Sequence, residues 1–193
     1  MSTSSVDIRR KTAKPLLWIG MASMAMAFAG LTSGYVVARS SLVAKGGWSE
    51  VDFPMAFYFS TAVLLATSVI LHFGMKSFKS GNAQALTRAL GLALLGGIAF
   101  AVLQFSGWGE LIEEGLYFTG EKSTQAAQWF YVITWFHWMH ILAGLLVLST
   151  TFWQAKKGAY SQEKTMGAEL AVSFWHFLDI LWIYLFLFLQ IVR

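Results

Sequence analysis

Cysteine is absent and charged residues are scarce in this chain of 193 residues. Without cysteine there can be no disulfides, thiolate-held zinc ions, iron–sulfur clusters or thiolate-ligated haems. Charged residues make up 12% of the chain, against about 25% in typical soluble domains, so a soluble surface is hard to build. Hydrophobic residues make up 56%, and such a composition excludes a disordered chain.

What the chain has instead is five long apolar stretches. A bilayer crossing takes about 20 residues, and segments in lipid must be helical because every backbone polar group needs a partner within the segment. We therefore predict an all-α, polytopic membrane protein, a bundle of five transmembrane helices. The predicted spans are residues 15–38, 54–75, 86–107, 128–153 and 170–192.

Neither the linkers nor the two prolines indicate a boundary between domains in this chain. No linker is long enough to separate two domains, so we expect one transmembrane domain over residues 15–193 after a basic segment over residues 1–14. Pro15 and Pro54, the two prolines, stand where the first and second spans begin. A helix tolerates proline in its first turn, and we expect both to open their helices.

The basic residues lie at the ends of the spans, and they predict the direction of the chain through the membrane. Ten of them fall on one side and four on the other, so the positive-inside rule places the N-terminus in the cytoplasm and the C-terminus outside. The net charge of +4 is therefore a topology signal, and no nucleic-acid partner is expected. The ten are Arg9, Arg10, Lys11, Lys14, Lys76, Lys79, Arg88, Lys156, Lys157 and Lys164; the four are Arg39, Lys45, Lys122 and Arg193.

Four ionisable side chains lie inside the last two spans, where such groups are costly and usually face the bundle interior. His137 and His140 are three residues apart, as are His176 and Asp179, so each pair shares one helix face. The two helices are antiparallel, and this predicts His137 opposite Asp179 and His140 opposite His176. We expect a buried polar layer in which Asp179 accepts a hydrogen bond from His137.

Three interpretations of this layer are open on the pattern alone. In the first, a hydrogen-bonded layer fixes the helix register, with interhelical hydrogen bonds worth about 0.6 kcal/mol each in membranes. In the second, His140 and His176 are the axial ligands of a haem, which would make the chain a small di-histidine membrane cytochrome b. In the third, the layer is a proton relay. His72, near the inner end of the second span, is interpreted as an interfacial residue.

Small and aromatic residues indicate packing in the bundle. Gly30 and Gly34 form a G-x-x-x-G pair, a spacing that allows close helix approach. Four deep tryptophans bracket the polar layer and predict either its packing shell or an aromatic-lined lipid groove. They are Trp135, Trp138, Trp175 and Trp182.

The motifs of the last two spans resemble those of haem–copper oxidase subunit III. Residues 136–144 read F-H-W-M-H-I-L-A-G, similar to that family's F-H-G-x-H-x-x-x-G. Residues 169–182 read E-L-A-V-S-F-W-H-F-L-D-I-L-W, similar to E-x-x-x-x-Y-W-H-F-x-D-x-x-W. Glu169 matches the glutamate that opens the second motif. A weaker likeness, which includes the pair Leu103-Gln104, extends the resemblance over residues 15–192.

The resemblance implies the non-redox subunit III of a bacterial terminal oxidase of the cytochrome c oxidase type, in the cytoplasmic membrane. Five spans look like the short family form known from quinol oxidases, so the electron donor, cytochrome c or quinol, stays open. Haem and copper are then expected in subunits I and II, with none in this chain, and oxygen reduction with proton translocation is expected of the assembled enzyme. The implied partners are subunit I, subunit II, a small subunit IV, a larger respiratory supercomplex and phospholipid in a helix cleft.

Two positions depart from the family pattern. The family usually has an acidic residue where this chain has Met24, after Ser23, and a glutamate where this chain has Gly107. The family's proposed role for the first acid, near lipid or the entry of oxygen or protons, is therefore not expected here.

Overall fold

The protein is all-α, and five helices account for most of the chain. The computed structural model describes residues 3–121, 123–161 and 164–193, with side chains from residue 12 onward. All five helices are long and apolar enough to cross a membrane, as predicted. They are α1 (Thr3–Val43), α2 (Met55–Lys79), α3 (Ala83–Glu113), α4 (Gln125–Lys156) and α5 (Met166–Ile191).

Most helices extend beyond the predicted spans at both ends. The apolar stretches mark what lipid can cover, whereas backbone hydrogen bonding continues into the polar flanks. The expectation that Pro15 opens the first helix is wrong, because α1 begins at Thr3 and Pro15 lies inside it. Pro54 is placed as expected and immediately precedes α2. The side chains of Arg9, Arg10 and Lys11 lie outside the described part of the chain.

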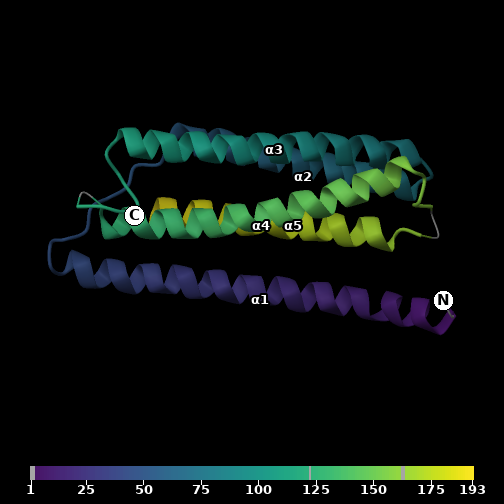
Figure 1. Cartoon of the computed structure of the whole chain (residues 1–193), viewed down its shortest axis with the longest axis horizontal. Helices are drawn as coiled ribbons and strands as arrows, with labels where there is room; N and C mark the ends of the chain where they lie inside the picture. The colour runs from purple at the N-terminus through teal and green to yellow at the C-terminus, as the bar shows by residue number, and fades with distance from the viewer. Residues whose placement is uncertain (1–2, 122, 162–163) are drawn as a thin grey trace.

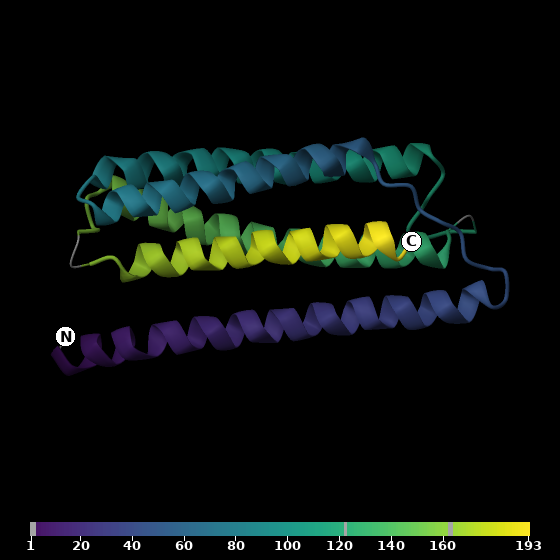
Figure 2. The ribbon, with the colours of Figure 1, turned by 180° about the vertical axis from the view of Figure 1, so that it is seen from behind.

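The helices form three layers (Figure 1). α2 and α3 make one layer, α4 and α5 the second, and α1 runs along the far side of the second layer. In the described residues α1 contacts α4 and α5 but neither α2 nor α3. The view from behind shows the same separation (Figure 2). The four-helix bundle α2–α5 therefore forms the body of the protein, and α1 lies against its side.

Side-chain caps and glycines end the helices where the chain must turn. Asn82 Oδ1 accepts from the Ala85 backbone N–H at 3.1 Å, and Thr124 Oγ1 accepts from Ala127 N–H at 3.2 Å. These caps satisfy N–H groups that have no partner inside the helix. Gly115, with φ of 82°, follows α3, and this left-handed conformation lets the chain close the helix end with backbone bonds.

Small residues allow α2 and α3 to pack closely. A Cβ atom added at Gly74 would collide with the Cβ atom of Ala89, and one added at Gly96 would collide with Thr67 Cγ2. Between α4 and α5, a Cβ atom at Gly144 would lie 2.7 Å from Leu178 Cδ1. These glycines therefore set the interhelical distances through backbone-to-side-chain contact.

At the two positions where the resemblance expects acidic residues, this chain has residues that pack against apolar side chains. Gly107 is buried against the ring of Phe57, and a Cβ atom at Gly107 would collide with ring atom Cε2. Phe57 is fully buried, so a glutamate could enter at position 107 only if this ring moved. Met24 is partly buried and packs against the hydrophobic core.

Only one glycine of the G-x-x-x-G pair makes a close contact within the described chain. A Cβ atom at Gly34 would lie 2.8 Å from Trp129 Cη2 of α4, whereas nothing lies within 4 Å of one at Gly30. Phe28, which faces the bundle, is fully buried. Gly30 lies one turn before Gly34 on the same helix face, but it is exposed and no neighbouring side chain reaches it.

We expect Gly74→Ala to destabilise the chain, because the added methyl group would push α2 away from α3. Overpacking of this kind costs about 1–3 kcal/mol. Gly30→Ala is the matched control, since a Cβ atom there meets nothing within 4 Å. Thermal unfolding in detergent, followed by circular dichroism, would show a lower midpoint for Gly74→Ala alone. Equal midpoints for the two variants would mean that the α2–α3 contact can widen without cost.

Candidate functional site

The four ionisable residues of α4 and α5 do not form one continuous layer. His137 and Asp179 are buried, with 0% and 2% of their surface exposed, whereas His140 and His176 are only partly buried. Both α4 histidines contact Phe28 of α1, whereas His176 of α5 contacts Ser68 of α2. The predicted layer is therefore divided between two sides of the bundle.

The two α4 histidines are packed among aromatic rings. The His137 ring stacks on Trp182 with centroids 5.0 Å apart, and Phe28 of α1 meets its edge at 6.1 Å. The ring of His140 also lies against Phe28, at 5.6 Å. His140 Nδ1 donates to the backbone oxygen of Phe136 at 2.7 Å, so that this bond stays within α4.

The two α5 residues lie at the contact with α2. Ser68 Oγ and His176 Nδ1 share a hydrogen bond of 2.5 Å. The Ser68 side chain also lies near Asp179, one helical turn beyond His176. No partner in the described residues meets hydrogen-bonding geometry with either carboxylate oxygen of Asp179.

The predicted hydrogen bond between His137 and Asp179 is wrong in this structure. Neither ring nitrogen of His137 has a hydrogen-bond partner in the described part of the chain. The reason is the register of the two helices, because His137 is level with Trp182, which is three residues beyond Asp179. Three residues correspond to about 4.5 Å along a helix, and rotation of α5 then turns Asp179 toward α2.

The predicted pairing of His140 with His176 is also wrong, and with it the geometry required for a bis-histidine haem. His140 contacts α1 and His176 contacts α2, and these two helices share no contact in the described residues. Over the same part of the chain, no group of three or more His, Asp or Glu side chains could hold a metal ion.

The tryptophans of the last motif join α5 to α2. The Trp175 indole N–H donates to Thr67 Oγ1 at 3.1 Å, and the Trp182 indole N–H donates to Thr61 Oγ1 at 2.9 Å. Each threonine hydroxyl donates in turn to a carbonyl of its own helix, Leu64 or Phe57. Both indoles are buried with their only donor satisfied, so these two tryptophans pack between α5 and α2.

The other two tryptophans lie at the contact between α3 and α4. The Trp138 indole N–H donates to the Ala101 carbonyl at 3.4 Å. Trp135 is 49% exposed and stacks on Trp108 at 5.6 Å. Trp108 is buried and donates to Thr134 Oγ1 at 3.1 Å. Trp138 therefore belongs to the packing, whereas Trp135 covers Trp108 from the surface.

Buried hydroxyl groups were not recognised as candidates from the sequence. Besides the threonines of α2, Ser60 accepts a hydrogen bond of 2.9 Å from the fully buried Gln104 of the Leu103-Gln104 pair. A signal was available, since serine and threonine in an apolar helix can donate to their own backbone and still accept from a neighbouring helix. Which of them do so depends on the rotation of both helices.

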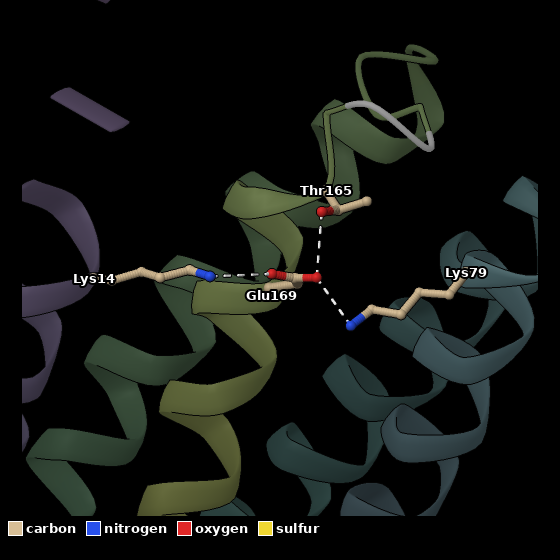
Figure 3. Close-up of polar contacts among 4 residues, drawn as sticks. All are labelled: Lys14, Lys79, Thr165 and Glu169. Carbon is tan, nitrogen blue, oxygen red and sulfur yellow. Dashed lines mark hydrogen bonds and ion pairs between the residues drawn. The ribbon is translucent and has the colours of Figure 1, made fainter. Parts of the chain in front are cut away.

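Glu169, the acid that opens the last motif, joins three helices at the end of the bundle that carries Lys14 and Lys79 (Figure 3). Its carboxylate oxygens lie 2.9 Å from Lys79 Nζ of α2 and 3.8 Å from Lys14 Nζ of α1, and Thr165 Oγ1 donates to it at 3.3 Å. Both lysines are more than half exposed. Exposed ion pairs contribute about 0–1 kcal/mol, so Glu169 orients α1 more than it stabilises the fold.

Two further polar contacts hold α1 against α5. Thr32 Oγ1 and Tyr184 Oη are hydrogen-bonded at 3.0 Å in the second half of α1. At the opposite end from Glu169, the Arg39 guanidinium donates twice to the Arg193 backbone oxygen, at 2.8 and 3.1 Å. Together with the Lys14–Glu169 pair, these contacts attach α1 at three levels between Lys14 and Arg39.

Comparisons with known proteins agree on one family. Residues 46–192 match the family described as cytochrome c oxidase subunit III. The cytochrome c oxidase subunit 3 of Corynebacterium diphtheriae is 29% identical over 172 residues, which cover 87% of this chain and 82% of that protein. The probable cytochrome c oxidase subunit 3 of Nocardia farcinica is 31% identical over 182 residues, which cover 92% and 86%. That of Thermostichus vulcanus is 27% identical over 186 residues, covering 91% and 85%.

We expect His137→Leu to leave the stability of the chain unchanged or to raise it, because an apolar side chain removes two buried nitrogens that lack a partner. Thr134→Val, one turn earlier on α4, should cost about 1 kcal/mol because Trp108 loses its acceptor. Thermal unfolding of both variants in detergent tests this. A large loss of stability in His137→Leu would show that His137 has a hydrogen-bond partner after all.

Proposed function

The chain belongs to the cytochrome c oxidase subunit III family, and on this basis we propose that it is the non-redox subunit III of a bacterial haem–copper terminal oxidase. It supports subunit I while the assembled enzyme reduces oxygen and translocates protons in aerobic respiration. The observation that carries the proposal is the family match over residues 46–192, which includes both motifs of α4 and α5. Subunit II, a small subunit IV and a respiratory supercomplex are further partners in this proposal.

The geometry of the motif residues favours a supporting role. Trp175 and Trp182 use their indole groups to join α5 to α2, and His137 is packed between aromatic rings. Such contacts position helices, so the chemistry with oxygen belongs to haem and copper in the partner subunits. The donor, cytochrome c or quinol, is a property of those partners, and a quinol oxidase subunit III remains the second candidate.

The proposal includes a bound phospholipid. It is supported by a hollow of about 400 Å³ where the start of α3 meets the end of α4. Small side chains line part of the hollow, and the cationic side chains of Arg88 and Lys156 line the rest together with Gln84 and Thr87. Neither cation is in an ion pair within the described residues. Basic hollows between helices at the cytoplasmic surface suit anionic lipid head groups.

The proposal also places the chain in the bacterial cytoplasmic membrane, with its N-terminus in the cytoplasm and its C-terminus outside. The support is the distribution of basic residues between the two ends of the helices. Lys14, Lys79 and Lys156 all lie at the end that this orientation assigns to the cytoplasm.

The first test is spectroscopic. Tagged chain should co-purify with subunits I and II, and the chain purified alone in mild detergent should show no Soret absorption before or after dithionite. A reduced b-type spectrum that disappears in His140→Ala and His176→Ala would make the chain a di-histidine cytochrome b. Recovery without any haem-bearing subunit from intact membranes would contradict the assignment as a subunit.

The second test concerns orientation, and the absence of native cysteine makes single labels unambiguous. A membrane-impermeant maleimide added to spheroplasts should label Thr119→Cys, in the loop between α3 and α4. It should label Ser80→Cys, in the turn between α2 and α3, only after permeabilisation. Both positions are exposed, so the opposite pattern would reverse the proposed topology.

A further inference from the structure

A shallow hollow lies on the outer surface between α2 and α5. Its volume is about 320 Å³. Three polar and three apolar side chains line it. The polar residues are Ser68, His72 and His176, and the apolar residues are Val69, Phe73 and Ile180.

The hollow lies toward the end of both helices that carries the Lys79–Glu169 pair, within their apolar stretches. The Lys79–Glu169 ion pair places those two residues at the same level. His72 is seven residues before Lys79, and His176 is seven residues after Glu169. At 1.5 Å per residue both histidines lie about 10 Å from the ion pair. Since the hydrocarbon core is about 30 Å thick, the hollow would face acyl chains if lipid covered it.

Imidazole groups at that depth need polar partners, and this hollow supplies too few. His176 uses one ring nitrogen with Ser68. His72 is exposed, and no hydrogen bond or ion pair involves it within the described residues. One turn further along α5, Asp179 is buried without a hydrogen-bond partner. Ionisable residues within spans pair with one another or with another protein group because lipid offers no partner.

The outer face of α3 shows what a lipid-facing surface of this protein looks like. Between Arg88 and Glu110 the helix has no ionisable residue. Its exposed side chains there include Leu95 at 66% and Val102 at 58%. The contrast between this face and the hollow indicates that the α2–α5 surface is covered by protein.

We propose that a transmembrane helix of oxidase subunit I packs against the α2–α5 surface and places a hydrogen-bonding side chain in this hollow. That side chain binds the free nitrogens of His72 and His176, and Val69, Phe73 and Ile180 pack around it. The inference rests on the proposed function, and it specifies which face of the chain meets the catalytic subunit.

Photo-cross-linking in the assembled oxidase in native membranes tests this directly. A photoreactive phenylalanine analogue replaces Ile180 at the hollow or, as a control, Leu95 on the outer face of α3. The two side chains are equally exposed, at 66%. We expect a product with subunit I from position 180 and products with lipid alone from position 95. Products with lipid alone from position 180, or a subunit I product from position 95, would overturn the inference.

A second measurement uses His72→Leu, with His140→Leu as the control. Because no hydrogen bond to another part of the described chain involves His72, the variant should leave thermal unfolding of the purified chain unchanged. In the complex it should raise the dissociation constant for subunit I about three- to twentyfold, the range of one interhelical hydrogen bond in a membrane. An unchanged constant would contradict the proposed contact.

The outcomes separate this inference from the function on which it rests. Failure to recover the chain with subunit I under any condition would contradict the proposed function. Recovery with subunit I, combined with cross-links from Leu95 and none from Ile180, would contradict only the choice of face. Equal weakening by His72→Leu and His140→Leu would also count against the α2–α5 surface.

Discussion

The hydrogen bonds between buried indole groups and threonine hydroxyls are the interaction on which this bundle depends. Lipid removes the hydrophobic drive between helices, since acyl chains are as apolar as leucine, so close packing and interhelical hydrogen bonds decide how helices associate. Trp175 and Trp182 are fixed by Thr67 and Thr61, six residues apart on α2. These bonds determine how α5 is rotated against α2. The rotation in turn places Asp179 and His176 toward α2 rather than toward α4.

A different set of contacts determines the position of α1. It shares no contact with α2 or α3 within the described residues, and polar contacts at Lys14, Thr32 and Arg39 attach it to α5 and to the C-terminal residue after it. Phe28 fills the space beside both α4 histidines. Few contacts therefore attach α1 to the bundle, and the ion pair between Lys14 and Glu169 sets the direction of α1 at one end.

The motif residues of α4 and α5 have separate tasks in this arrangement. His137 and the two motif tryptophans pack inside the bundle, whereas His176 reaches the outer surface with His72. A family signature that reads as one unit in the sequence thus serves both internal packing and the surface that we assign to subunit I. This division accounts for a subunit that has specific polar residues at membrane depth without a redox centre of its own.

Sequence alone was sufficient for the all-α class, the five spans and the family, because burial in lipid demands long apolar helices and the last motif is distinctive. It also identified Glu169 and the Gly30–Gly34 pair as residues of interest. Only the tertiary structure decided that His137 is level with Trp182 instead of Asp179, that Gly34 and not Gly30 meets a side chain of α4, and that Phe57 fills the space at Gly107. Each of these depends on helix rotation and axial offset. A shift of three residues moves a side chain by about 4.5 Å, and such a shift is set by interlocking side chains from several helices at once.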